Sequence, residues 1–195
     1  MGEEARGDEA SESWRSAAPY LKRFFSSTPK QQARLLRRAP IDDLQRLALH
    51  HGDPSVRRNC LFFLDHYANE ASTAVFAEAL ADPANTVRNA ALHSIACESC
   101  RTAELCAGDV VSAVAGLLAR DPDPDLRAKA IKTLLRLADR DRGAWEAIER
   151  AAEHDSDAIL RGVAAQAFHG VVVTPSKRRQ RWQQRHDHPV ARSSA

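Results

Sequence analysis

The segment Asp82-Pro83-Ala84-Asn85-Thr86-Val87-Arg88-Asn89-Ala90-Ala91-Leu92 is one copy of a pattern that occurs four times in this chain. In each copy an acidic residue that can cap a helix comes first, and an aliphatic residue followed directly by arginine opens the helix. The successive arginines are 31, 39 and 34 residues apart, a period typical of helix pairs that stack on their neighbours. They are Arg57, Arg88, Arg127 and Arg161.

The residues after each arginine keep a fixed spacing of small and large side chains. The third residue is small and the seventh is large and apolar, as expected for positions that face a neighbouring helix. Between successive copies lie shorter apolar segments, which predict further helices over 70–81, 109–119 and 142–152. No strand-like alternation competes, so the sequence predicts an all-α fold. The small positions are Cys60, Ala91, Ala130 and Ala164, and the large ones are Leu64, Ile95, Leu134 and Phe168.

Four regions differ in composition, although the formal net charge of the whole chain is only +2. Residues 1–13 are small and acidic with nothing to bury, so we expect a disordered arm there. Residues 14–40 have apolar residues at helical spacing and predict an N-terminal helical cap. The repeat domain covers 41–170 and begins with a helix over Ile41–His50, and 171–195 form a basic tail.

An aliphatic-arginine pair after an acidic turn, with Ala and Leu at fixed offsets, resembles the HEAT repeat. The closest likeness is to the short bacterial HEAT-like repeats first recognised in phycobilin lyases. This resemblance implies a right-handed α-solenoid of about four helix pairs over 41–170. It also implies that the four arginines form a structural ladder between successive turns, with a ligand-binding role as the alternative. The acidic partners implied are Asp53, Asp82, Asp121 or Asp123, and Asp155 or Asp157.

Three of the four cysteines gather where the repeat has its longest gap, in the pattern Cys97-x2-Cys100-x5-Cys106. His93 lies four residues before Cys97, so a helix would place both on one face. Two thiolates at Cys-x2-Cys spacing can reach one metal, and these four residues predict a zinc site. Packed reduced thiols that close the loop, or a redox-active Cys97–Cys100 pair, are the alternatives. Cys60 is expected to be a small core residue.

The helices that open with aliphatic-arginine also carry a mostly polar stripe. In the HEAT family such helices line the concave side, so the resemblance makes this stripe a candidate surface for a protein partner. The alternative is an ordinary solvated face. The residues of the stripe, besides His93, are Arg58, Phe62, His66, Asn89, Lys132, Arg136 and Gln166.

The resulting prediction is a non-enzymatic protein-binding scaffold or regulator. Catalytic signatures such as a Gly-rich phosphate loop, Gly-x-Ser-x-Gly or a His-Glu pair do not occur in the sequence. One alternative is a nucleic-acid-associated protein that uses cations and an aromatic in 177–185, and another is a metal- or redox-responsive regulator. Because no apolar run suits a signal or a membrane span, we expect a cytoplasmic protein with no membrane partner.

Overall fold

The computed structural model describes residues 3–67, 70–97, 107–138 and 140–173. Every regular element in these residues is a helix and none is a strand, which confirms the predicted all-α class. The helices are α1 (Glu3–Phe24), α2 (Pro29–Leu36), α3 (Ile41–His50), α4 (Pro54–Tyr67), α5 (Glu70–Ala79), α6 (Asn85–Ala96), α7 (Ala107–Arg120), α8 (Pro124–Leu137), α9 (Arg142–His154) and α10 (Ala158–Val173).

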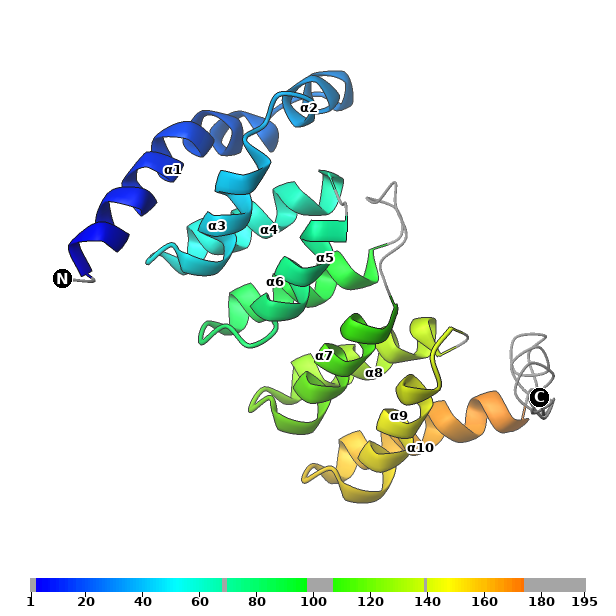
Figure 1. The fold of residues 1–195 in the computed structure, drawn as a ribbon. Coiled ribbons are helices and arrows are strands. Elements are labelled where there is room, and N and C mark those ends of the chain that lie inside the picture. Colours follow the sequence, from blue (N-terminus) through cyan, green and yellow to red (C-terminus); the bar gives the residue numbers. More distant parts are fainter. Residues whose placement is uncertain (1–2, 68–69, 98–106, 139, 174–195) are drawn as a thin grey trace, which may run out of the picture.

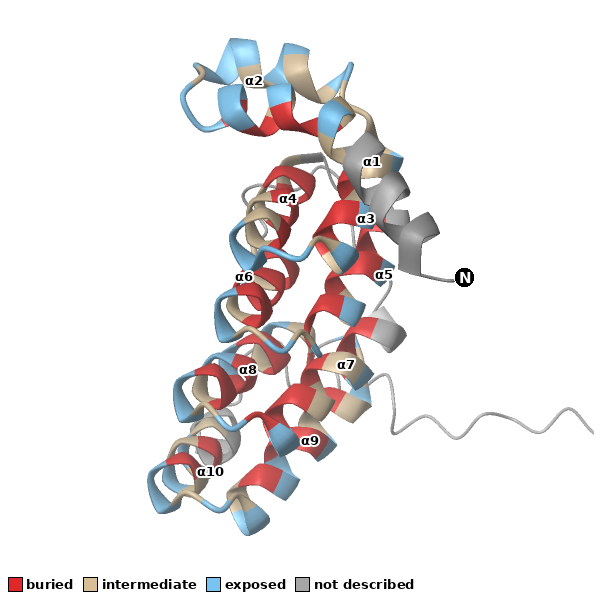
Figure 2. Cartoon of the chain, turned by 90° about the vertical axis from the view of Figure 1, so that its left-hand side faces the viewer, coloured by how far each residue is buried: buried red, intermediate tan, exposed pale blue. Residues whose placement is uncertain are grey.

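Helices α3 to α10 lie in two layers (Figures 1 and 2). The first-helix layer consists of α3, α5, α7 and α9, and each of these contacts the next. The second-helix layer consists of α4, α6, α8 and α10, which contact one another in the same order. The buried faces of the helices turn toward the space between the layers, as Figure 2 shows. Each pair therefore buries its apolar side against its own partner and against the pairs beside it.

The predicted inward positions are buried. The small residues at the third position after each arginine have no exposed surface, so the helix backbones can approach closely there. The large residues at the seventh position are at most 1% exposed where their side chains are described, and Phe168 lies outside that set. The spacing of small and large side chains thus predicted the core faces of the second-helix layer. These residues are Cys60, Ala91, Ala130, Ala164, Leu64, Ile95 and Leu134.

The N-terminal region differs from the prediction in where its first helix begins. We expected residues 1–13 to be disordered, whereas the backbone of α1 is helical from Glu3. The sequence allows a helix here, since residues 3–13 contain no proline and include alanine, the strongest helix former, at positions 5 and 10. At its other end α1 packs on the repeat, where the Phe24 ring lies 4.4 Å from that of Phe63.

Helix α2 begins with two capping residues, Thr28 and Gln31. The Gln31 Oε1 atom accepts hydrogen bonds from the Thr28 N–H at 2.9 Å and from its hydroxyl at 3.0 Å. No residue of α2 is buried, and Figure 1 shows the helix projecting beyond the end of the two layers. Its position depends on α1, since the Gln32 amide donates to the Phe24 carbonyl at 3.0 Å. At the opposite end of the stack, α10 continues to Val173, past the boundary expected at residue 170.

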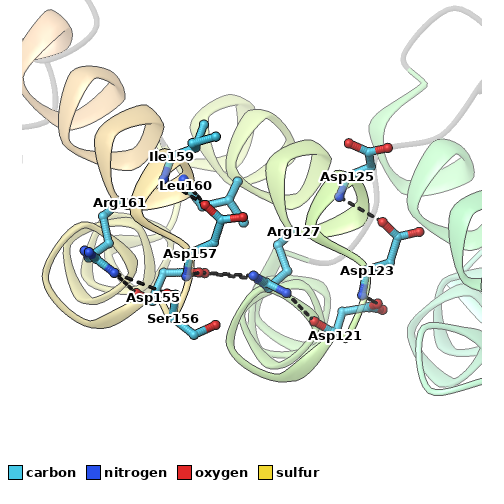
Figure 3. Close-up of polar contacts among 10 residues, drawn as sticks. All are labelled: Asp121, Asp123, Asp125, Arg127, Asp155, Ser156, Asp157, Ile159, Leu160 and Arg161. Atoms are coloured by element: carbon cyan, nitrogen blue, oxygen red, sulfur yellow. Dashed lines mark hydrogen bonds and ion pairs between the residues drawn. The ribbon is translucent and has the colours of Figure 1, made fainter.

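Arginine–aspartate pairs join successive turns of the stack. Arg57 donates from Nε and Nη2 to the two carboxylate oxygens of Asp82, at 2.7 and 2.8 Å. Arg88 pairs in the same way with Asp121, at 2.7 and 3.0 Å. Each arginine also donates through Nη1 to backbone carbonyls of its own turn. The third pair, Arg127 with Asp155 at 3.1 and 3.2 Å, is drawn in Figure 3.

The linking aspartates also close the turns in which they lie. In each, the oxygen Oδ1 accepts from the backbone N–H two residues later, at 2.8 Å in Asp82, 2.9 Å in Asp121 and 2.8 Å in Asp155. The other acidic residues of the pattern instead accept from N–H groups at the starts of their helices. The structure thus divides two roles that the sequence left open. Those helix-start residues are Asp53, Asp123 and Asp157.

The two ends of this series differ from its middle. Six residues before Arg57, where the later turns have aspartate, the chain has His51, whose Nδ1 accepts from the Asp53 N–H at 3.0 Å. The imidazole lies against Trp14 of α1, with ring centroids 5.5 Å apart. At the other end Arg161 donates to the Asp155 and Ser156 carbonyls at 2.7 and 3.3 Å, and it pairs with no carboxylate of the described residues (Figure 3).

Burial makes the three pairs consequential for stability. Their arginine side chains are at most 10% exposed and their aspartates at most 6%. The hydrogen bonds to carboxylate raise the pKa of Arg57 and Arg88 above the ordinary arginine value, so these guanidinium groups stay charged at neutral pH. Removing one partner of a buried pair leaves a buried charge uncompensated, which costs about 3–5 kcal/mol.

We therefore predict different costs for two arginines at the same repeat position. Arg88→Ala should lower the free energy of unfolding by about 3 kcal/mol, because it leaves the Asp121 carboxylate buried and unpaired. Arg161→Ala removes only bonds to carbonyl groups and should cost about 1 kcal/mol. Urea denaturation of both variants measures the difference. Equal losses would show that the link between turns adds nothing to the bonds within a turn.

Candidate functional site

The exposed side of the second-helix layer carries charge of nearly one sign. The only carboxylates in α4, α6, α8 and α10 are Asp65, which is 1% exposed, and Asp125 at the start of α8. The carboxylates of the first-helix layer whose side chains are described lie on α3, α5 and α9: Asp42, Asp43, Glu78, Glu146, Glu149 and Glu153. We call the cationic and histidine side chains of the second-helix layer, apart from the four arginines of the repeat pattern, the basic face. They are Arg58, His66, His93, Lys129, Lys132 and Arg136.

Two cations of α8 bridge to the neighbouring helix α6. The Lys129 ammonium donates to the Asn89 Oδ1 at 2.8 Å, and Arg136 Nη1 donates to the Ala96 carbonyl at 2.8 Å. Lys132 lies between them in sequence and is exposed, as is Gln166 on α10. Sequence analysis missed Lys129, because its backbone position lies next to the buried Ala130 and only its long side chain reaches the surface.

The predicted stripe residues of α4 are half-buried and have aromatic or polar neighbours. The Phe62 ring meets the His93 ring edge to face, with centroids 5.6 Å apart. His66 lies 5.2 Å from Phe24 of α1, and Arg58 Nη2 reaches the Asn59 Oδ1 at 3.4 Å. The stripe therefore combines half-buried residues of α4 with exposed residues of α6 and α8.

A cluster of three ligand-type side chains lies at the end of α6. The carboxylate of Asp65 on α4 lies 3.7 Å from His93 Nε2, and the ligand atoms of Asp65, His93 and Cys97 are all within 4.8 Å of one another. Cys97 caps α6, and its N–H donates to the His93 carbonyl at 2.8 Å. Asp65 is buried whereas the His93 side chain is 53% exposed, so the cluster opens toward solvent on one side.

The structure brings together two of the four residues that the sequence assigned to metal. His93 and Cys97 face the same point, whereas Cys100 and Cys106 lie outside the described residues. Sequence analysis missed Asp65, although a signal was present, since this carboxylate directly follows a run of apolar residues in a helix. Asp65 is eight residues after Arg57. The residue eight positions after Arg88 in the next repeat is Ala96, which directly precedes Cys97.

A second basic surface lies between α1 and α2, in a groove that includes the partly buried Tyr20 and Leu35. Residues 14–41 contain seven cations and no carboxylate, and four of the cations line this groove. Sequence analysis treated this region only as a cap, although the absence of acidic residues was a readable signal. The four are Arg23, Arg34, Arg37 and Arg38.

Comparisons with protein families, curated proteins and solved structures found no match to this chain. Among the described residues, no helix has the length and apolar character required to cross a membrane. The basic segment 177–185 lies outside the described residues.

The reactivity of the Cys60 thiol tests whether this residue is buried in the core. Its side chain is fully buried, and this burial raises the pKa of the thiol to about 12, so roughly one molecule in ten thousand has a thiolate at pH 8. In a Cys97→Ser/Cys100→Ser/Cys106→Ser variant, we expect iodoacetamide to label the native protein far more slowly than the urea-unfolded protein. Mass spectrometry follows the label, and equal rates would contradict the burial of Cys60.

Proposed function

We propose that this chain is a non-enzymatic interaction protein of the HEAT type, a right-handed α-solenoid whose basic face binds an acidic segment of a partner protein. The repeat pattern, the two contacting layers and the arginine–aspartate pairs support the first part of this proposal. The charge of the second-helix layer supports the second part, and it is the observation that carries the function.

Three cations of α8 lie on one side of this helix. Lys129, Lys132 and Arg136 are three and four residues apart, so their side chains leave the same side of the helix. Their bonds to Asn89 and the Ala96 carbonyl reach across to α6 without any carboxylate. No carboxylate of the described residues pairs with these cations, and unpaired cations produce a positive potential that favours encounter with an acidic surface. The half-buried Phe62 adds apolar contact area beside them.

Reversing two of these charges should abolish binding to such partners. We predict that Lys132→Glu/Arg136→Glu lowers the capture of acidic partners from a nuclease-treated lysate about tenfold or more, because repulsion replaces attraction. The matched control is Arg120→Glu/Arg150→Glu, which makes the same charge change on exposed positions of the first-helix layer. Quantitative mass spectrometry compares the three proteins, and undiminished capture by Lys132→Glu/Arg136→Glu would rule out the basic face as the binding surface.

A second candidate function is favoured by the α1–α2 groove, which combines four arginines with the partly buried ring of Tyr20. Cations beside an aromatic suit the phosphates and bases of a nucleic acid. This proposal moves the predicted nucleic-acid contact from the tail to the N-terminal helices.

The salt dependence of binding distinguishes this candidate. We predict that Arg34→Glu/Arg37→Glu/Arg38→Glu weakens binding of a fluorescent single-stranded oligonucleotide and reduces the slope of log K against log salt by about two, since single strands lose roughly 0.7 per phosphate contact. Fluorescence anisotropy at several salt concentrations measures both quantities. If this variant keeps the affinity and slope of the wild type, the groove does not bind nucleic acid.

A further inference from the structure

We propose that Asp65, His93 and Cys97 bind one divalent transition-metal cation, with zinc as the best fit, and thereby join α4 to the end of α6. The inference is independent of the proposed partner. It rests on the convergence of three different donor atoms, within 4.8 Å of one another, from two consecutive helices of the second-helix layer.

The donor set selects the kind of metal. A thiolate, an imidazole and a carboxylate are the three ligand types that Zn²⁺ accepts, whereas Ca²⁺ and Mg²⁺ take mainly oxygen ligands. Metal–ligand bonds of about 2.0 to 2.3 Å in a tetrahedral site separate neighbouring ligand atoms by roughly 3.3 to 3.8 Å. The cluster therefore needs a contraction of at most about 1.5 Å to hold such an ion.

The chain fixes each ligand by a different structural device. Asp65 is held in the core side of α4 at 1% exposure. His93 and Cys97 are four residues apart, and the hydrogen bond from the Cys97 N–H to the His93 carbonyl keeps them on the same turn. The ring of Phe62 packs against the imidazole and limits its rotation. Ligands oriented in this way lose less freedom when they bind a metal.

The negative charges of the proposed ligands favour a cation between them. A carboxylate that is only 1% exposed is stabilised when an opposite charge lies close to it. A divalent cation between Asp65, His93 and Cys97 would balance the carboxylate and the thiolate together. Three protein ligands leave the fourth tetrahedral position for water or another ligand.

Cobalt(II) provides a direct test on the full chain, because it replaces zinc in such sites and its bond to thiolate gives a charge-transfer absorption band. We expect the wild-type protein, reduced and freed of metal, to bind one Co²⁺ per chain with this band and to release it when Zn²⁺ is added. Cys97→Ser should remove the band, and His93→Ala and Asp65→Asn should each weaken Co²⁺ binding by about tenfold or more. Cys60→Ser and His66→Ala are matched controls that should behave like the wild type.

Two outcomes would overturn the proposal. Absence of stoichiometric Co²⁺ binding by the wild type would leave the cluster as a thiol beside an Asp–His ion pair. Wild-type affinity in both His93→Ala and Asp65→Asn, with loss of binding in Cys100→Ser/Cys106→Ser, would indicate a cysteine-only site elsewhere in the chain. Because Asp65 is buried, circular dichroism must show that its variant is folded, and the exposed His93 supplies the same test if it is not.

Unfolding supplies an independent readout. A metal that binds only the folded chain, at a free concentration of 100 Kd, should lower the unfolding equilibrium constant about 100-fold. We expect Zn²⁺ to produce this shift in the wild-type protein and in Cys60→Ser but not in His93→Ala. An equal shift in His93→Ala would contradict ligation by the imidazole.

Discussion

The bidentate pair between an arginine of one repeat and an aspartate of the next turn is the interaction on which the rest of this structure depends. The aspartate accepts two N–H bonds from the arginine and a third from the backbone N–H two residues later, so one carboxylate fixes both a turn and the distance to the preceding repeat. Apolar burial drives the helices together but has no direction. The pairs supply the direction, because a guanidinium that donates two hydrogen bonds to one carboxylate must meet it edge to edge in a common plane.

The arginine–aspartate pairs fix the register, that is, how each repeat is aligned with the next. This register decides which residues meet on the outer side of the second-helix layer. It places Asp65 of α4 opposite the last turn of α6, and it brings Asn89 of α6 within reach of Lys129 of α8. Residues separated by one repeat in the sequence thus become neighbours in space. The proposed metal site and the basic face use the same register, and each takes side chains that a single helix pair could not bring together.

Much of the architecture could be predicted from the sequence because it follows local rules. Spacing along the chain predicted the recurring arginines and the helix over Ile41–His50. It also predicted the small and large buried residues that follow each arginine. What could not be predicted depends on contacts between elements. Asp82 and Asp123 are both acids before a helix, and only the position of the preceding arginine decides that one links turns and the other caps. Asp65 became a candidate ligand only when α4 lay beside α6.

A double-mutant cycle on Arg88 and Asp121 tests most directly whether these pairs hold the stack together. Urea unfolding of Arg88→Ala, Asp121→Ala and the double variant isolates the energy of the pair from the bonds that each residue makes within its own turn. A coupling energy of about 2 kcal/mol or more is the result that this structure predicts. A coupling below about 0.5 kcal/mol would mean that the two residues act separately and that packing alone sets the register.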